Sequence, residues 1–272
     1  MTEQAISIGY RKKLTVYILA ALALGVGLSD LITYIMYMRG GSTIDSPTFL
    51  GNGIPWVLGI SIVILLFSGR DRLDRLDTIL VGLALLCAAV PQVLSFTIAI
   101  DTFSIIDWER ERAVAILLLV QIASFSLSHL LLAIRHGREP MRKHFHPQTP
   151  SAFARGVVAG IVIVFIGVLV VSAARLHVLD LLVLPLVIGG ASLWAAGDAA
   201  CVDRFPSTNT LFILLGVVFW FAHELISSAY YLSASGLHAT AVIDTLCRFS
   251  SAFLYQPSFL LLSLSVYRFD GE

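Results

Sequence analysis

Five polar residues interrupt five different apolar stretches of the 272-residue chain: Asp30, Gln92, Gln121, Glu224 and Arg248. Each lies nine or ten residues from the presumed outer end of its helix, counted to Arg39, Asp101, Arg112, Ser233 and His238. At 1.5 Å per residue this is roughly 14 Å below the outer surface of the membrane, near the middle of a ~30 Å hydrocarbon core. The spacing predicts one polar layer, in which the two acids neutralise Arg248 and the two glutamines complete the hydrogen bonds.

Such a layer has two interpretations. Ionisable groups in hydrocarbon are costly and usually functional, and two carboxylates against one guanidinium leave an acid that could carry a proton or bind a ligand in a hydrated cavity. His223, next to Glu224, belongs to the same candidate proton relay. The alternative is a structural clamp, because hydrogen bonds between membrane helices stabilise their packing by ~1 kcal/mol each.

A second pair of polar residues is expected nearer the cytoplasm. His129 and Asp198 each lie six residues before an arginine, Arg135 and Arg204, which places both roughly 9 Å from the inner boundary. A histidine beside an aspartate is a general-base arrangement; alternatively, Asp198 sits at a helix end and His129 bonds a backbone carbonyl. The same count places His223 roughly 21 Å from that boundary, which argues against one haem iron bound by both histidines.

The elements that carry these residues are membrane helices. The chain is 57% hydrophobic and 13% charged, with a mean hydropathy of +0.87, and a bilayer is crossed by roughly 20 apolar residues in a helix. Eight stretches have about that length: 14–38, 53–68, 76–100, 113–134, 154–174, 178–199, 209–233 and 240–267. These runs predict an all-α polytopic bundle of about eight transmembrane helices that forms a single integral membrane domain, residues 1–272.

The distribution of basic residues predicts the orientation. Of the 18 Lys and Arg, thirteen fall on one side of the expected bundle and four on the other, with Arg248 inside a helix. Because cytoplasmic loops are enriched in Lys and Arg, both termini are expected in the cytoplasm, and the bacterial cytoplasmic membrane is the expected location. This topology also explains the basic loop from Arg135 to Lys143 without a nucleic-acid partner.

Neither a metal site nor a cofactor is expected. Cys87, Cys201 and Cys247 show no disulfide or CxxC pattern. His136, together with His144 and His146, lacks a thiol or carboxylate at metal-ligand spacing. These histidines are therefore expected in a solvated loop.

One region resembles the bacterial YhhN-like lysoplasmalogenase family. The residues concerned are the run Gly190–Asp198, the loop Asp203-Arg204-Phe205, the run Phe219–Ile226 and the segment Ser128-His129-Leu130-Leu131. The resemblance implies an eight-helix membrane hydrolase that cleaves the vinyl-ether bond of lysoplasmalogens, with Asp198 as an acidic catalytic residue.

Three functions therefore remain open. The first is a membrane-embedded lipid hydrolase in which Asp198 and His129 activate water against a lysolipid. The alternative is a proton-coupled transporter or ligand-sensing receptor that uses the mid-membrane layer to hold a polar small molecule. The third is a structural subunit of a membrane complex. The expected partners are membrane lipids and one of these small ligands.

Overall fold

The computed structural model describes residues 14–29, 32, 53–69, 72–101, 107–144, 183–236 and 241–269. Within these ranges every secondary-structure element of more than one residue pair is a helix, so the expectation of an all-α fold is confirmed there. After the helix Leu14–Ser29 come α2 (Gly53–Phe67), α3 (Arg75–Asp101), α4 (Asp107–His144), α6 (Val183–Cys201), α7 (Ser207–Gly236), α8 (Ala241–Ser250), the π-helical segment η4 (Ser251–Tyr255) and α9 (Gln256–Leu264).

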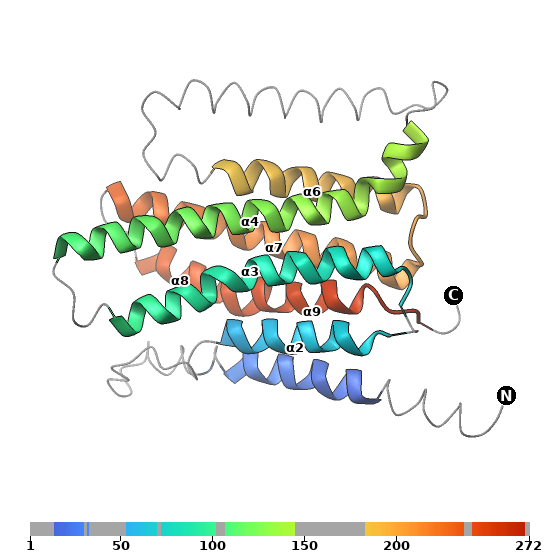
Figure 1. Cartoon of the computed structure of the whole chain (residues 1–272), viewed down its shortest axis with the longest axis horizontal. Coiled ribbons are helices and arrows are strands. Elements are labelled where there is room, and N and C mark those ends of the chain that lie inside the picture. The colour runs from blue at the N-terminus through green and yellow to red at the C-terminus, as the bar shows by residue number, and fades with distance from the viewer. Residues whose placement is uncertain are drawn as a thin grey trace.

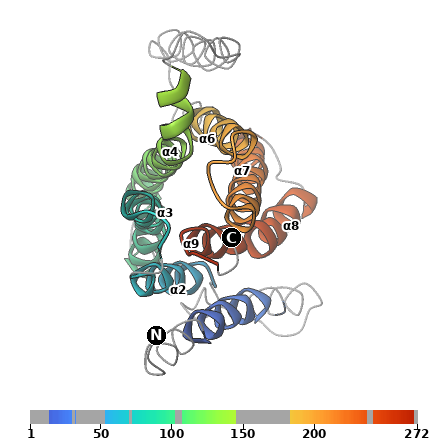
Figure 2. The same ribbon diagram turned by 90° about the vertical axis from the view of Figure 1, so that its right-hand side faces the viewer.

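Six of these helices form a closed ring. α2 packs on α3, α3 on α4, α4 on α6, α6 on α7, α7 on α9, and α9 again on α2. Viewed along the helices, α8 and the helix Leu14–Ser29 lie outside this ring (Figure 2). α4 and α6 run in the same direction, whereas α7 runs back between α6 and α9 (Figure 1). The ring therefore directs one face of α4, α6, α7 and α9 toward a common interior.

The apolar composition of the helices supports an integral membrane protein. Four of the described helical stretches are long and apolar enough to cross a bilayer: Arg75–Val93, Leu119–Arg138, Val183–Cys201 and Ser207–Tyr230. Large apolar side chains are exposed on the outside of the bundle, for example Leu66 at 78% and Val93 at 62%. Such surfaces are unfavourable in water but suit the lipid of a membrane.

The last predicted stretch, 240–267, is divided in the structure. Pro257 has no N–H to donate to the carbonyl of Phe253, so the regular helical bond is missing at this level. The chain instead forms η4, and the Gln256 N–H donates to the Ser251 carbonyl five residues back. A π-helical turn of this kind re-aims the side chains on it and is frequent at functional sites.

Two other expectations need correction or lie outside the described residues. The stretch predicted at 113–134 continues as one helix to His144, so the basic segment after Arg135 is helical and is not a loop. The end of the first stretch beyond residue 32 and the whole stretch 154–174 lie outside the described residues.

Candidate functional site

A buried acid–base pair lies inside the ring. The Nε2 atom of His129 on α4 lies 2.8 Å from Oε2 of Glu224 on α7, and the two side chains are 0% and 4% exposed. Oε1 of Glu224 accepts a hydrogen bond of 2.9 Å from the indole N–H of Trp220, one turn earlier on α7. Two groups that can each hold a proton are therefore in contact where water is scarce.

The pair is under-satisfied in hydrogen bonds. Although Nε2 and Oε2 are at ion-pair distance, they are not aligned as a hydrogen bond. No hydrogen-bond partner among the described residues is found for either ring nitrogen of His129 or for Glu224 Oε2. Buried polar groups are usually fully bonded when their role is structural. These atoms are therefore available to a proton, a water molecule or a ligand.

Small residues on α6 bring the helices close enough for this contact. A Cβ atom at Gly189 would lie 3.3 Å from His129 Nε2 and 2.9 Å from the ring of Phe221. Glycine at this position lets α6 approach both α4 and α7. The spacing of the pair thus depends on three helices.

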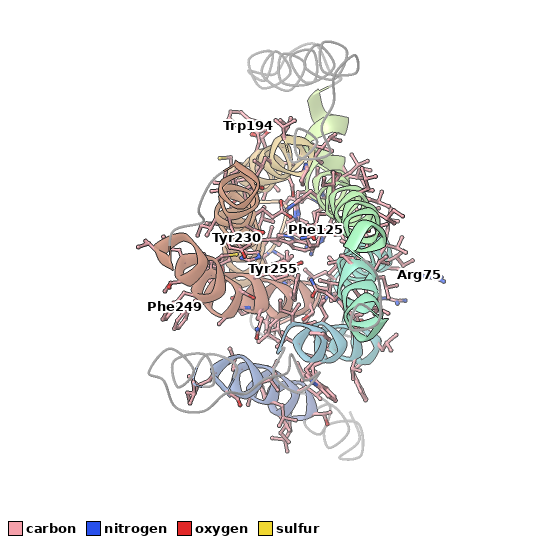
Figure 3. The ribbon with its side chains drawn as sticks, turned by 90° about the vertical axis from the view of Figure 1, so that its left-hand side faces the viewer. Arg75, Phe125, Trp194, Tyr230, Phe249 and Tyr255 are labelled. Carbon is pink, nitrogen blue, oxygen red and sulfur yellow. The ribbon has the colours of Figure 1, made fainter. Side chains whose placement is uncertain are left out.

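Aromatic rings surround the pair. The indole of Trp220 lies 5.1 Å from the His129 ring and makes edge-on contacts with Tyr255 at 5.9 Å and Phe259 at 5.1 Å, measured between ring centroids. Phe125 meets Tyr255 edge-on at 6.0 Å. Phe125 and Tyr255 point into the interior of the ring of helices, whereas Arg75 points outward (Figure 3). The rings exclude water from most of the site and strengthen its electrostatics.

The neighbouring His223 connects the pair to η4. Its Nδ1 atom lies 2.9 Å from the Ser250 hydroxyl, and its ring stacks on Tyr255 with 4.4 Å between centroids. Ser250 in turn donates to the Cys247 carbonyl. The histidine is therefore held by the residues at and just before the π-helical segment.

A small cavity of about 20 Å³ opens beside Glu224. Its lining includes the polar residues Gln121, His223, Glu224, Ser227 and Ser228. This is room for about one water molecule, which requires two to four polar partners. The cavity gives the carboxylate a polar neighbourhood into which a proton could move.

The structure brings together only part of the predicted layer. Gln121, His223 and Glu224 share the cavity, as their expected depth suggested. Gln92 is half-buried on α3 and is not among the cavity-lining residues. Asp30 and the side chain of Arg248 lie outside the described residues, so the proposed pairing of Arg248 with the two acids stays a prediction.

His129 and Asp198 are not brought together. The count placed both roughly 9 Å from the inner boundary, with α4 expected to end near Arg135, whereas α4 continues to His144. His129 lies level with Gly189 and Glu224, whereas Asp198 is nine residues farther along α6, about 14 Å away at the helical rise. His129 and His223 therefore share one cluster, and depth is no argument against a common ligand.

Some residues of the site escaped the sequence analysis. Trp220 precedes Glu224 by four residues, which places both on one face of a helix, so its contact could have been predicted. Tyr255 and Ser250 had no comparable pattern. They reach His223 only because η4 turns them inward, and the one local indication was Pro257.

A second polar cluster lies at the end of the bundle where α4 and α6 end. Arg204 donates to the carbonyls of Arg135 and of His136, the latter at 2.9 Å, and to Asp77 Oδ1 on α3 at 3.1 Å. The guanidinium groups of Arg204 and Arg135 both lie over the ring of Phe205, at 4.6 and 5.2 Å from its centroid. We call these residues, with Asp74, Arg138 and Ser265, the arginine cluster.

Local backbone geometry aims Arg204 into this cluster. At the end of α6 the Arg204 N–H donates to the Ala199 carbonyl and the Asp203 N–H to the Ala200 carbonyl. Asp203 has a φ of 48°. These bonds form a Schellman motif, which requires a left-handed residue at this position, and aspartate tolerates that conformation better than most residues.

The arginine cluster contains two residues, Arg135 and His136, that were expected in a solvated loop. Arg135 is 0% exposed and donates to the Ser265 hydroxyl and carbonyl, and His136 is equally buried, so neither lies in a solvated loop. Arg138 pairs with Asp74 at 2.5 Å. This hydrogen bond holds the pKa of Asp74 below its usual value. These charges tie helix ends together.

Metal binding and kinship to known proteins give no further guidance. Among the described residues no three His, Cys, Asp or Glu side chains are grouped so that they could hold a metal ion. Comparison of the chain with protein-family models, with curated proteins and with solved structures gives no match.

Proposed function

We propose that the protein is a proton-coupled membrane transporter of a small polar solute, and that His129 and Glu224 carry the proton. The observation that carries this proposal is the buried 2.8 Å contact between an imidazole and a carboxylate. Intramembrane ionisable residues that face a bundle interior commonly serve as proton relays. The same site could serve a ligand-sensing receptor, which would bind the solute without moving it.

The chemistry of the pair suits reversible protonation. With one proton the pair is neutral overall, with none it carries one negative charge, and with two it carries one positive charge. Because the two atoms lie 2.8 Å apart, a proton gained or lost by one group changes the charge next to the other. A change of net charge in a water-poor site alters the stability of the surrounding helix packing. Protonation can thus favour one arrangement of the helices over another.

Other titratable groups face the pair. His223 is on α7, and Tyr255 reaches it from η4. α6 contributes Gly189 at the contact, and the side chain of Arg248 on α8 lies outside the described residues. The described side chains around the pair therefore include Trp220, His223 and Tyr255.

We expect Glu224→Gln to abolish solute-driven proton movement while the protein remains folded. Glutamine preserves the shape and can still accept from Trp220, but it does not titrate. The measurement is the internal pH of pyranine-loaded proteoliposomes after addition of amino acids, sugars and organic amines in turn. Adding Gln92→Glu to Glu224→Gln places a carboxylate outside the cavity, and it should not restore proton movement. If none of these solutes drives proton movement in the wild type, the transporter proposal is wrong.

The lipid hydrolase remains a second candidate. Asp198 is half-buried close to the arginine cluster, at a depth where a lysolipid headgroup could lie, and it is the acid that the resemblance to lysoplasmalogenases implies. Purified wild type should then hydrolyse a lysoplasmalogen in detergent, and Asp198→Asn should not, since an amide cannot exchange the required proton. Hydrolysis that survives Asp198→Asn would rule out this assignment.

We further propose about eight transmembrane helices with both termini in the cytoplasm of a bacterium. The helix Leu14–Ser29 begins, and α9 ends, at the same end of the bundle (Figure 1), and the arginine cluster lies at that end. Cys201 is exposed there. It should react with an impermeant maleimide only in inside-out vesicles, and a cysteine at position 107, at the start of α4, only in right-side-out cells. Labelling of both from one side would contradict the topology.

A further inference from the structure

An apolar cavity of about 150 Å³ lies on the side of η4 away from the acid–base pair. It lies between the helix Leu14–Ser29, α2 and the junction of η4 with α9, and it is open on one side. Its lining includes Ala23, Gly27, Val57, Ala252, Pro257 and Leu260. Gln256 contributes the one polar side chain among the described lining residues. The cavity is therefore suited to hydrocarbon and unsuited to a polar solute.

We propose that this cavity binds a hydrocarbon group supplied by the membrane, such as a benzene-sized ring or the end of an acyl chain, and that η4 couples its occupancy to the acid–base pair. The coupling rests on the proposed function, whereas the binding does not. An engineered apolar cavity of about 150 Å³ in a soluble protein stays dry and binds benzene. A cavity of this size is therefore large enough for a benzene-sized hydrocarbon group.

The edge of the cavity is open to the lipid side of the bundle. Leu24, Leu28 and Phe253 line it and are 57%, 58% and 54% exposed. In a membrane these side chains face acyl chains, where hydrocarbon molecules are concentrated. A ligand can therefore enter laterally without crossing the polar interior.

One short segment contacts the cavity and also His223, which adjoins Glu224 in the chain. Ala252 and Phe253 line the cavity, while Tyr255 stacks on His223 and Ser250 lies 2.9 Å from His223 Nδ1. All four residues lie within η4 or immediately before it. Displacing this turn on the cavity side must therefore move the groups that hold His223.

Binding is tested by photolabelling the purified full chain in nanodiscs. A small phenyl diazirine should label residues of the cavity edge, and excess benzene should abolish that labelling. A lipid with a diazirine at the end of its acyl chain, used in a parallel sample, shows whether lipid itself occupies the cavity, because its labelling would also be lost with benzene. If excess benzene reduces the labelling by neither probe, the proposal is wrong.

Two substitutions test the place of binding. Ala23→Leu fills the cavity and should abolish benzene-sensitive labelling, whereas Ala21→Leu, the same change at an exposed position of the same helix, should leave it intact. If the filled variant does not fold, Leu260→Ala provides the opposite test. This enlarged cavity should let naphthalene displace the probe where the wild type does not. Equal behaviour of the folded variants would contradict the assignment.

The coupling is tested through reciprocity, because two coupled sites change each other's affinity by the same factor. The benzene concentration that displaces half of the probe should differ about fivefold or more between pH 5 and pH 8 in the wild type, and this difference should be lost in His129→Leu/Glu224→Gln, which lacks both titratable groups of the pair. A pH-independent value in the wild type would overturn the coupling. Proton movement driven by solute judges the transporter proposal separately, since displacement of the probe requires no transport.

Discussion

Replacing Arg204 by alanine should lower the free energy of unfolding by about 3–5 kcal/mol, the cost of breaking a buried ion pair by removing one partner. The side chains of Arg204 and Asp77 are 3% and 5% exposed, so the buried aspartate would keep, among the described residues, only the more distant Arg138, at 3.5 Å, as its cationic partner. The carbonyls of Arg135 and His136 would lose their donor at the same time. The measurement is unfolding in detergent by titration with SDS, followed by circular dichroism.

Two further substitutions separate charge from geometry. Arg204→Lys restores the charge but not the planar fork that reaches two carbonyls and Asp77 together, so it should recover only part of the loss. Arg268→Ala removes an exposed arginine and should leave the unfolding free energy near that of the wild type. If Arg204→Ala unfolds like Arg268→Ala, the arginine cluster does not hold the helix ends together.

Replacing His129 by leucine should be similarly severe, with a loss of about 3–5 kcal/mol in the same SDS titration. Leucine fills a similar space in the core, but it leaves the Glu224 carboxylate with only the Trp220 N–H. The double variant His129→Leu/Glu224→Gln should regain most of the loss, because no charge then remains buried. If the double variant is no more stable than His129→Leu, the contact between the two residues is not what stabilises them.

His136 offers a matched control for that experiment. It lies on the same helix and is also 0% exposed, but unlike His129 its ring has no carboxylate at ion-pair distance among the described residues. His136→Leu leaves no partner stranded, so it should change the unfolding free energy by less than about 1.5 kcal/mol, as volume-conserving core changes do. A loss equal to that of His129→Leu would show that the imidazole volume matters more than the ion pair.

The helical architecture could be predicted because it follows from local composition. A run of apolar residues must form its own backbone hydrogen bonds in lipid, so run length alone predicts a helix. The stretches at 53–68 and 76–100 lie within one residue of α2 and α3. The end of α4 could not be found in this way. Arginine normally marks a membrane boundary, but Arg135 is buried against Ser265, which lies 130 positions away in the chain.

The candidate site shows the same division between local and non-local information. Glu224, His223 and Gln121 were expected at one depth and line one cavity, because depth along a helix depends only on position in the chain. Which group faces Glu224 was a question of rotation about each helix axis and of helix order in the ring. Depth carries no information on either, and the expected pairing of His129 with Asp198 was therefore replaced by its contact with Glu224.

By itself the sequence determined that this is an all-helical membrane protein, and it determined which few polar side chains its helices carry into the apolar interior. The tertiary structure decided which of them meet. The approach of α6 at Gly189, the rotation of α4 and the π turn before Pro257 placed His129, Glu224 and His223 in one cluster. The physical reason is that hydrophobicity acts on each residue separately, whereas an ion pair requires two residues from different helices to arrive at the same point.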